Sequence, residues 1–236
     1  MTTTWIIIIA VIAVAILICF LLAIANYSYE RFMAKYKELD QIYIKSNLMP
    51  YDFVNMINRE YFSGKLQIIQ ISQVAGDAYG KGKLFLSTST LSNNSIASFT
   101  IIAHEMGHAK QDKEGKKLKR LNFMRKFGRF IGFFMTPLLI AGAVLLFFEN
   151  LRIISYILLA SSALIFLLAL LLKLLTISIE KDASKNAIQF LEEIFDEVEM
   201  KRAKRFLKDA RLTYWADFLK IALFWTALSK KTKLFN

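Results

Sequence analysis

The sequence is poor in the residues that most often form cross-links and turns. Its 236 residues include one cysteine, two prolines and nine glycines. The single cysteine, Cys19, lies within an apolar run, which excludes an intramolecular disulfide and a zinc site built from cysteines. The scarcity of proline and glycine argues against a disordered chain and against a turn-rich β sandwich. Histidine is equally scarce, because the chain has only two.

Apolar residues are abundant instead. Hydrophobic residues make up 56% of the chain and the mean hydropathy is +0.41, which is more apolar than an ordinary soluble domain. The formal net charge is +12 at pH 7. The basic residues flank the apolar runs and form no motif of a nucleic-acid-binding protein. We therefore expect anionic lipid headgroups, and no nucleic acid, as the partner of these charges.

Three apolar runs are long enough to cross a bilayer as helices. They extend from Trp5 to Ala25, from Phe130 to Phe148 and from Ile153 to Ile177. The only charge inside them is Lys173, near the end of the third run, where a lysine can reach the headgroups. The alternative, three buried core helices, is disfavoured because the runs are so long in so short a chain.

The first run could also be a cleaved signal peptide, because Ala23-Ile24-Ala25 resembles a cleavage site. However, the leader Met1-Thr2-Thr3-Thr4 carries no positive charge and the apolar core is too long. The first run is therefore predicted to be an uncleaved anchor.

The distribution of lysine and arginine predicts the orientation. Residues 26–129 carry 17 of them and residues 178–236 carry 12, whereas the hairpin Glu149–Arg152 carries one. Since basic segments stay in the cytoplasm, we expect a multi-pass protein of the cell membrane. Residues 1–25 form the anchor, 26–129 and 178–236 are cytoplasmic, and 130–177 form a transmembrane hairpin. The N-terminus then lies outside.

Both histidines lie in the stretch His104-Glu105-Met106-Gly107-His108. On a helix this spacing places the two imidazoles one turn apart on the same face, where they can bind one Zn²⁺. The glutamate between them lies beside the metal, in the position of a general base. A catalytic zinc site needs a third protein ligand, which must be a carboxylate because the chain has no third histidine.

Two carboxylates just beyond the third run are candidates for this ligand. Glu180 and Asp182 follow Ile177 on the predicted cytoplasmic side, in what looks like a helical continuation of the run. Glu180 shares a helix face with Ser184, whereas Asp182 points away from that face. We assign Glu180 as the third ligand and keep Asp182 as the competitor. A solvated helix end without a metal is the alternative for both.

The pattern resembles the YugP-like membrane zinc metallopeptidases, distant relatives of the HtpX and CAAX-prenyl-protease group. The matching pieces are His104 to Gln111, Glu180 to Ser184, Gly76-Asp77 before a strand, and Leu212-Thr213-Tyr214. The resemblance covers nearly the whole chain. The resemblance implies zinc-dependent endopeptidase activity, with Glu180 as the third ligand.

The chain departs from this group at two places. Residues 77–82 form a shorter and less polar loop than in the relatives, and Ser184 stands where the wider group usually has an aspartate. An aspartate there would support the metal ligands by hydrogen bonding, and this chain lacks it.

Local signals place the motif on a helix beside two strands. Asn93-Asn94-Ser95 offers N-cap residues, and the helix is expected to run to about Asp112 and to stop near Gly115. Residues 66–72 and 83–88 are predicted to be two short strands around a glycine-rich turn. An edge strand there can pair with an extended substrate, although a purely structural hairpin explains the pattern equally well.

We therefore predict a mainly α integral membrane protein. It has three transmembrane helices and a cytoplasmic zincin-like helical catalytic domain with a small β hairpin. Zn²⁺ is held by His104, His108 and Glu180, and Glu105 is the general base. Tyr214 or Arg211 is a candidate donor to the developing oxyanion. Asp182, if it is not a ligand, is a candidate to support the site.

The predicted substrates are membrane-associated proteins or peptides, because Glu180 follows the third run closely. At 1.5 Å per residue, the zinc lies roughly 5–15 Å from the bilayer surface. Residues 212–228 are expected to form an amphipathic helix, with a fourth crossing as the alternative. The rival functions are a non-catalytic zinc-binding membrane scaffold, which an intact Glu105 disfavours, and a transporter, which the near absence of charge in the runs disfavours.

Overall fold

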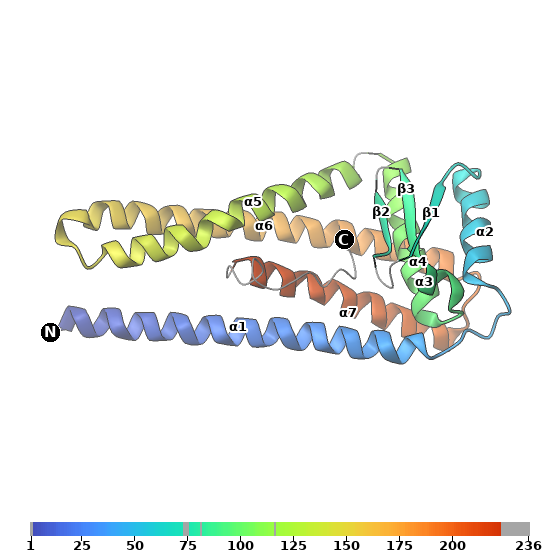
Figure 1. The fold of residues 1–236 in the computed structure, drawn as a ribbon, viewed down its shortest axis with the longest axis horizontal. Coiled ribbons are helices and arrows are strands. Elements are labelled where there is room, and N and C mark those ends of the chain that lie inside the picture. The colour runs from blue at the N-terminus through green and yellow to red at the C-terminus, as the bar shows by residue number, and fades with distance from the viewer. Residues whose placement is uncertain (1, 73–75, 81, 116, 223–236) are drawn as a thin grey trace. The chain divides into compact units, whose positions relative to one another are not determined.

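A computed structural model of the chain describes residues 2–72, 76–80, 82–115 and 117–222. It is mainly helical with one small sheet, as predicted (Figure 1). The elements in chain order are α1 (Thr2–Asp40), α2 (Pro50–Phe62), β1 (Gln67–Ile71), β2 (Ala78–Gly80), β3 (Lys83–Ser87), α3 (Thr88–Ser92), α4 (Ile96–Lys113), α5 (Lys117–Leu145), the 3-10 turn η1 (Glu149–Leu151), α6 (Arg152–Leu191) and α7 (Glu197–Ala222).

The sheet has three strands in the order β1-β3-β2. β1 runs parallel to β3, whereas β2 runs antiparallel to it. The predicted hairpin between residues 66–72 and 83–88 is therefore wrong, because those two strands point the same way. The chain between them is long enough to hold β2, which carries it back to the starting end before β3 begins. The hairpin that does form joins β2 to β3.

The chain separates into two compact units, each described by itself. The sheet unit comprises Phe32–Met124 and Leu174–Arg211. The apolar unit comprises the described residues up to Arg31, Arg125–Lys173 and the part of α7 from Leu212 onward. Helices α1, α5, α6 and α7 each contribute residues to both units.

The core of the sheet unit surrounds α4. Ile96, Phe99, Ile102 and Met106 of this helix are fully buried. The ring of Phe99 lies 5.3 Å from that of Phe53 on α2, measured between centroids. Because apolar neighbours cover α4 on all sides and not on one stripe, it is a core helix, and polar side chains on it lie in the protein interior.

The apolar unit contains a hairpin of two long helices, α5 and the first part of α6. Two segments, Lys119–Leu145 and Glu149–Leu191, are long and apolar enough to cross a membrane. Leucines on α6 such as Leu164 and Leu167 are 68% and 60% exposed. The hydroxyls of Ser155 and Ser162 donate to main-chain carbonyls of α5, which ties the two helices together. The first segment overlaps the second predicted span from Phe130 to Leu145, and the second segment contains the whole of the third.

The first predicted span, Trp5 to Ala25, lies within α1, but most of its side chains are outside the described part of the structure. Its crossing of a membrane stays a prediction. The predicted helix over residues 212–228 forms the end of α7 as far as Ala222, and its remainder lies outside the described residues.

Candidate metal centre

Helix α4 begins and ends where its sequence predicts. The hydroxyl of Ser95 caps it by accepting the main-chain N–H of Ser98 at 3.2 Å, and the helix ends at Lys113. His104 and His108 follow each other by one turn, with ring centroids 4.9 Å apart. Both imidazoles are buried, at 6% and 5% exposure. The helix therefore presents them side by side within the core.

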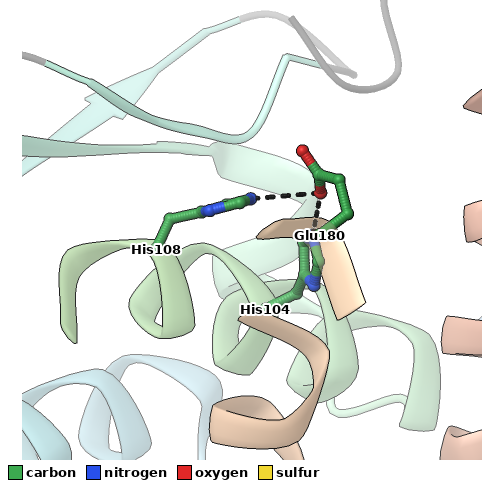
Figure 2. Close-up of side chains that lie close together, drawn as sticks. All are labelled: His104, His108 and Glu180. Atoms are coloured by element: carbon green, nitrogen blue, oxygen red, sulfur yellow. Dashed lines mark ion pairs between the residues drawn. The ribbon is translucent and has the colours of Figure 1, made fainter. Parts of the chain in front are cut away.

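Glu180 of α6 meets both histidines, as Figure 2 shows. One carboxylate oxygen, Oε2, lies 3.3 Å from Nε2 of His104 and 3.3 Å from Nε2 of His108. The three residues form a cluster whose ligand atoms all lie within 4.8 Å of one another. Glu180 is 0% exposed. The structure thus brings together the three residues that the sequence assigns to the metal.

The spacing of these atoms suits a zinc ion. In a tetrahedral site with bonds of about 2.0–2.1 Å, neighbouring ligand atoms lie roughly 3.3–3.4 Å apart. The two nitrogen–oxygen distances of 3.3 Å match that edge. Two imidazoles and one carboxylate are also the donor set of catalytic zinc sites that keep a fourth position for water. The residues present therefore fit Zn²⁺.

Gly107 allows α4 and α6 to approach this closely. A Cβ atom at this position would collide with the main-chain oxygen of Ala183, which follows Glu180 by three residues. The side-chain amide of Asn186 also donates to the main-chain oxygen of Gly107 at 3.3 Å. The two helices are therefore in contact through their backbones beside the ligands. The motif predicts the ligands on α4 but not this contact.

Glu105 lies on the same helix and is bound to the edge strand of the sheet. Its Oε2 accepts the main-chain N–H of Tyr79 on β2 at 2.7 Å. The phenol of Tyr79 donates to Asp112 at 2.9 Å, so strand β2 is attached to α4 at two points. Burial raises the pKa of Glu105 above its usual range, and the neighbouring imidazoles and the Tyr79 N–H counteract part of that rise.

Gln111 is a buried polar residue that the sequence analysis did not single out. Its Oε1 lies 3.0 Å from Nδ1 of His108, and its amide nitrogen donates to the main-chain oxygen of Ile179 and to Asp182. It is 0% exposed. Its position three residues after His108, on the same helix face, is the signal that could have found it.

The other residues that the sequence suggested for the site are not part of the ligand cluster. Asp182 is not part of the cluster of ligand atoms, and it accepts a hydrogen bond from Gln111 at 3.0 Å. The hydroxyl of Ser184 donates to the main-chain oxygen of Glu180. Tyr214 belongs to the apolar unit, where Arg125 donates to its hydroxyl and Lys173 lies 5.1 Å from its ring centroid. An oxyanion-donor role for Tyr214 or Arg211 stays a prediction.

Comparison with known proteins agrees with a zinc site. The model of a family described as "Putative neutral zinc metallopeptidase" matches residues 7–229. No curated protein and no solved structure shows significant similarity to the chain. The family match includes α4 and α6, the two helices that carry His104, His108 and Glu180.

Proposed function

Because the chain belongs to this family of neutral zinc metallopeptidases, we propose that it is a membrane-bound endopeptidase that cleaves membrane-associated proteins. The observation that carries the proposal is the buried cluster of His104, His108 and Glu180 beside Glu105. A purely structural zinc site gains nothing from a buried carboxylate between its two histidines, whereas hydrolysis needs a proton acceptor there.

Glu105 carries the proton transfers in this mechanism. A bound Zn²⁺ supplies Lewis acidity to the peptide carbonyl and makes a neighbouring water more acidic. The Tyr79 N–H holds Oε2 of Glu105, which leaves Oε1 to accept the proton of the attacking water. The same carboxyl then returns the proton to the leaving amine nitrogen. His104, His108 and Glu180 are the residues that would hold the metal ion.

We place the substrate backbone along β2. This strand lies at the edge of the sheet, pairs with β3 on one side only, and is attached to α4 through Tyr79. An extended peptide can pair with such an edge through main-chain hydrogen bonds, with its scissile carbonyl directed towards the metal ligands. A strand with only a structural role remains the alternative.

Membrane-associated substrates are favoured by the composition of α6. Glu180 lies three residues beyond the apolar run that ends at Ile177, on one uninterrupted helix. We propose that α5 and α6 cross the membrane, because both candidate spans are apolar and mostly exposed. The basic flanking segments favour a cytoplasmic active site by the positive-inside rule.

The substitution Glu105→Gln tests the mechanism. It keeps the size of the side chain and removes its basicity, so peptide hydrolysis should fall about 10²–10⁴-fold. Zinc content of the purified full-length protein should stay unchanged. Glu114→Gln is a matched control, because Glu114 is an exposed glutamate next to the C-terminal end of the same helix. Wild-type turnover in zinc-loaded Glu105→Gln would overturn the proposal.

The non-catalytic scaffold predicts a different result. In that case the wild-type protein binds one zinc per chain but cleaves neither a casein substrate nor a library of peptides in detergent or in vesicles. Zinc bound without any hydrolysis would therefore replace the peptidase proposal with the scaffold.

A further inference from the structure

We propose that Gln111 is the positioning residue of the metal centre: it fixes the tautomer of His108 and anchors α4 to α6 on both sides of Glu180. This inference rests on the proposed zinc site, and it goes beyond the ligands and the base. It is carried by three hydrogen bonds of one side chain that is 0% exposed.

The orientation of the Gln111 amide is determined by its surroundings. One end of the amide faces two acceptors, the main-chain oxygen of Ile179 at 2.8 Å and the carboxylate of Asp182 at 3.0 Å. Only the NH₂ group can donate to both of them. The other end, which lies 3.0 Å from His108, must therefore be the carbonyl oxygen Oε1.

This orientation determines which nitrogen of His108 carries the proton. A carbonyl oxygen can only accept, so Nδ1 of His108 must donate to it. In a neutral imidazole, Nε2 then has a lone pair available for a metal. That nitrogen lies 3.3 Å from the Glu180 carboxylate, on the side of the ligand cluster. Gln111 therefore selects the tautomer that binds zinc.

The same side chain joins the two halves of the ligand set. Ile179 directly precedes Glu180 on α6 and Asp182 follows it by two residues, so the amide contacts α6 on both sides of the ligand. Ser184 does not supply this link, because its hydroxyl donates to the main-chain oxygen of Glu180. Gln111 on α4 therefore gives the His108 imidazole the hydrogen-bonding support that Ser184 on α6 does not supply.

An exchange of donor and acceptor tests the proposal. In Gln111→Glu the carboxylate still accepts from His108, but it faces Asp182 and loses its donor. In the double variant Gln111→Glu with Asp182→Asn, the asparagine amide can donate to the new carboxylate, so the link to residue 182 is restored with its polarity reversed. The hydrogen bond to the main-chain oxygen of Ile179 stays lost in both variants, because a carboxylate has no donor. Gln111→Met keeps the length of the side chain and removes both hydrogen-bonding ends.

The readouts are the zinc dissociation constant of the full-length protein, by competition with a chelating dye, and the visible spectrum of the Co²⁺-loaded protein. We expect zinc affinity to fall about 10–100-fold in Gln111→Met and in Gln111→Glu, and to be higher in the double variant than in Gln111→Glu. The Co²⁺ spectrum should change in Gln111→Met and recover with the affinity. Thermal unfolding of the metal-free protein monitors the fold.

A role in packing alone predicts another pattern. It would lower the melting temperature of the metal-free Gln111→Met and double variants alike and would leave the affinity of the folded protein unchanged. Wild-type zinc affinity in Gln111→Met, or a double variant no better than Gln111→Glu, overturns the inference. If Gln111→Met does not fold, the zinc affinities of Gln111→Glu and the double variant are compared instead. Equal affinities in these two variants overturn the inference.

Failure of the inference and failure of the proposed function are distinguishable. A wild-type protein that binds zinc without hydrolysing peptides, while Gln111→Met still loses affinity, contradicts the peptidase and supports the positioning role. Abolished hydrolysis in Glu105→Gln, combined with unchanged zinc affinity in Gln111→Met, supports the peptidase and contradicts the positioning role.

Discussion

Helix α6 belongs to two environments that treat its side chains in opposite ways. In the apolar unit, Leu164, Leu167 and Leu171 are 68%, 60% and 53% exposed. In the sheet unit, Ala183 and Phe190 of the same helix are 0% exposed. Large apolar side chains that face outward along several turns mark a surface for membrane or protein, whereas small and aromatic residues inside a core mark tight packing.

Polar groups show the same contrast. The sheet unit buries His104, Glu105, His108 and Glu180 together, although charged groups in a protein interior are costly unless they are paired or bind a metal. The buried Ser155 and Ser162 of the apolar unit each donate to a main-chain carbonyl. The candidate metal-binding and acid–base groups are therefore concentrated in the sheet unit. In the apolar unit, the buried serines hold two helices together.

The largest expected effect is that of a change at Glu180, the proposed metal ligand on α6. Glu180→Gln removes the charged ligand with little change in size. Zinc affinity should fall by roughly two to three orders of magnitude, because a binding free energy of about 10–16 kcal/mol is shared among three or four ligands. The zinc content of the purified protein is measured by elemental mass spectrometry. Glu192→Gln is the control, because Glu192 is exposed. Full zinc occupancy in Glu180→Gln would return the assignment to Asp182.

A glycine contact in the sheet unit comes next. Gly107→Ala places a Cβ against the main-chain oxygen of Ala183, so α6 must move away and carry Glu180 with it. We expect a loss of about 1–3 kcal/mol in unfolding free energy, together with weaker zinc binding. Gly128→Ala is the matched control, because its Cβ would lie 4.0 Å from Leu172 in ordinary contact. Unchanged zinc affinity in Gly107→Ala would contradict the role of the contact.

A second glycine contact sharpens the contrast between the units. Gly142→Ala would place its Cβ 2.9 Å from the side chain of Leu159 and 3.2 Å from its main-chain nitrogen, within the α5–α6 hairpin. A side chain can move more cheaply than a backbone, so we expect a loss of only about 1 kcal/mol. Unfolding in detergent measures this loss, and zinc affinity should not change. Adding Leu159→Ala to Gly142→Ala should relieve the clash with the Leu159 side chain. A change of zinc affinity in Gly142→Ala would contradict the independence of the two units.

The smallest effect concerns the serines of the hairpin. Ser155→Ala and Ser162→Ala each remove one hydrogen bond to α5, which in membrane proteins contributes on average about 0.6 kcal/mol. The neighbouring Ser161→Ala, at a half-exposed position, serves as the control. Unfolding in mixed detergent micelles measures the difference, and losses equal to those of Ser161→Ala would show that these bonds contribute nothing measurable.

The sequence predicted which three residues would come together in the candidate metal cluster because chemistry left few choices. Two histidines at helical spacing need a third donor, and the carboxylates after the third apolar run supplied it. The structure brings Glu180, and not Asp182, to the histidines. The bounds of α4 followed from Ser95 and Gly115, whose cap and turn signals act within a few residues.

Features that depend on how distant segments pack could not be predicted. The parallel pairing of β1 with β3 depends on where the chain travels between them, and the local strand pattern is the same for either direction. The contact of Gly107 with Ala183 and the hydrogen bonds of Gln111 to α6 exist only because α6 crosses α4 at these positions. No spacing rule within α4 indicates that crossing.

The separation of the ligands along the chain has a consequence for biosynthesis. The ribosome makes His104 and His108 first, then the whole of α5, and reaches Glu180 only near the end of α6. A nascent chain that ends before Glu180 contains His104, His108 and Glu105 but lacks the Glu180 carboxylate. It therefore cannot form the complete site. Metal acquisition, and with it any proteolytic activity, must wait until the hairpin between the two ligand-bearing helices has been synthesised.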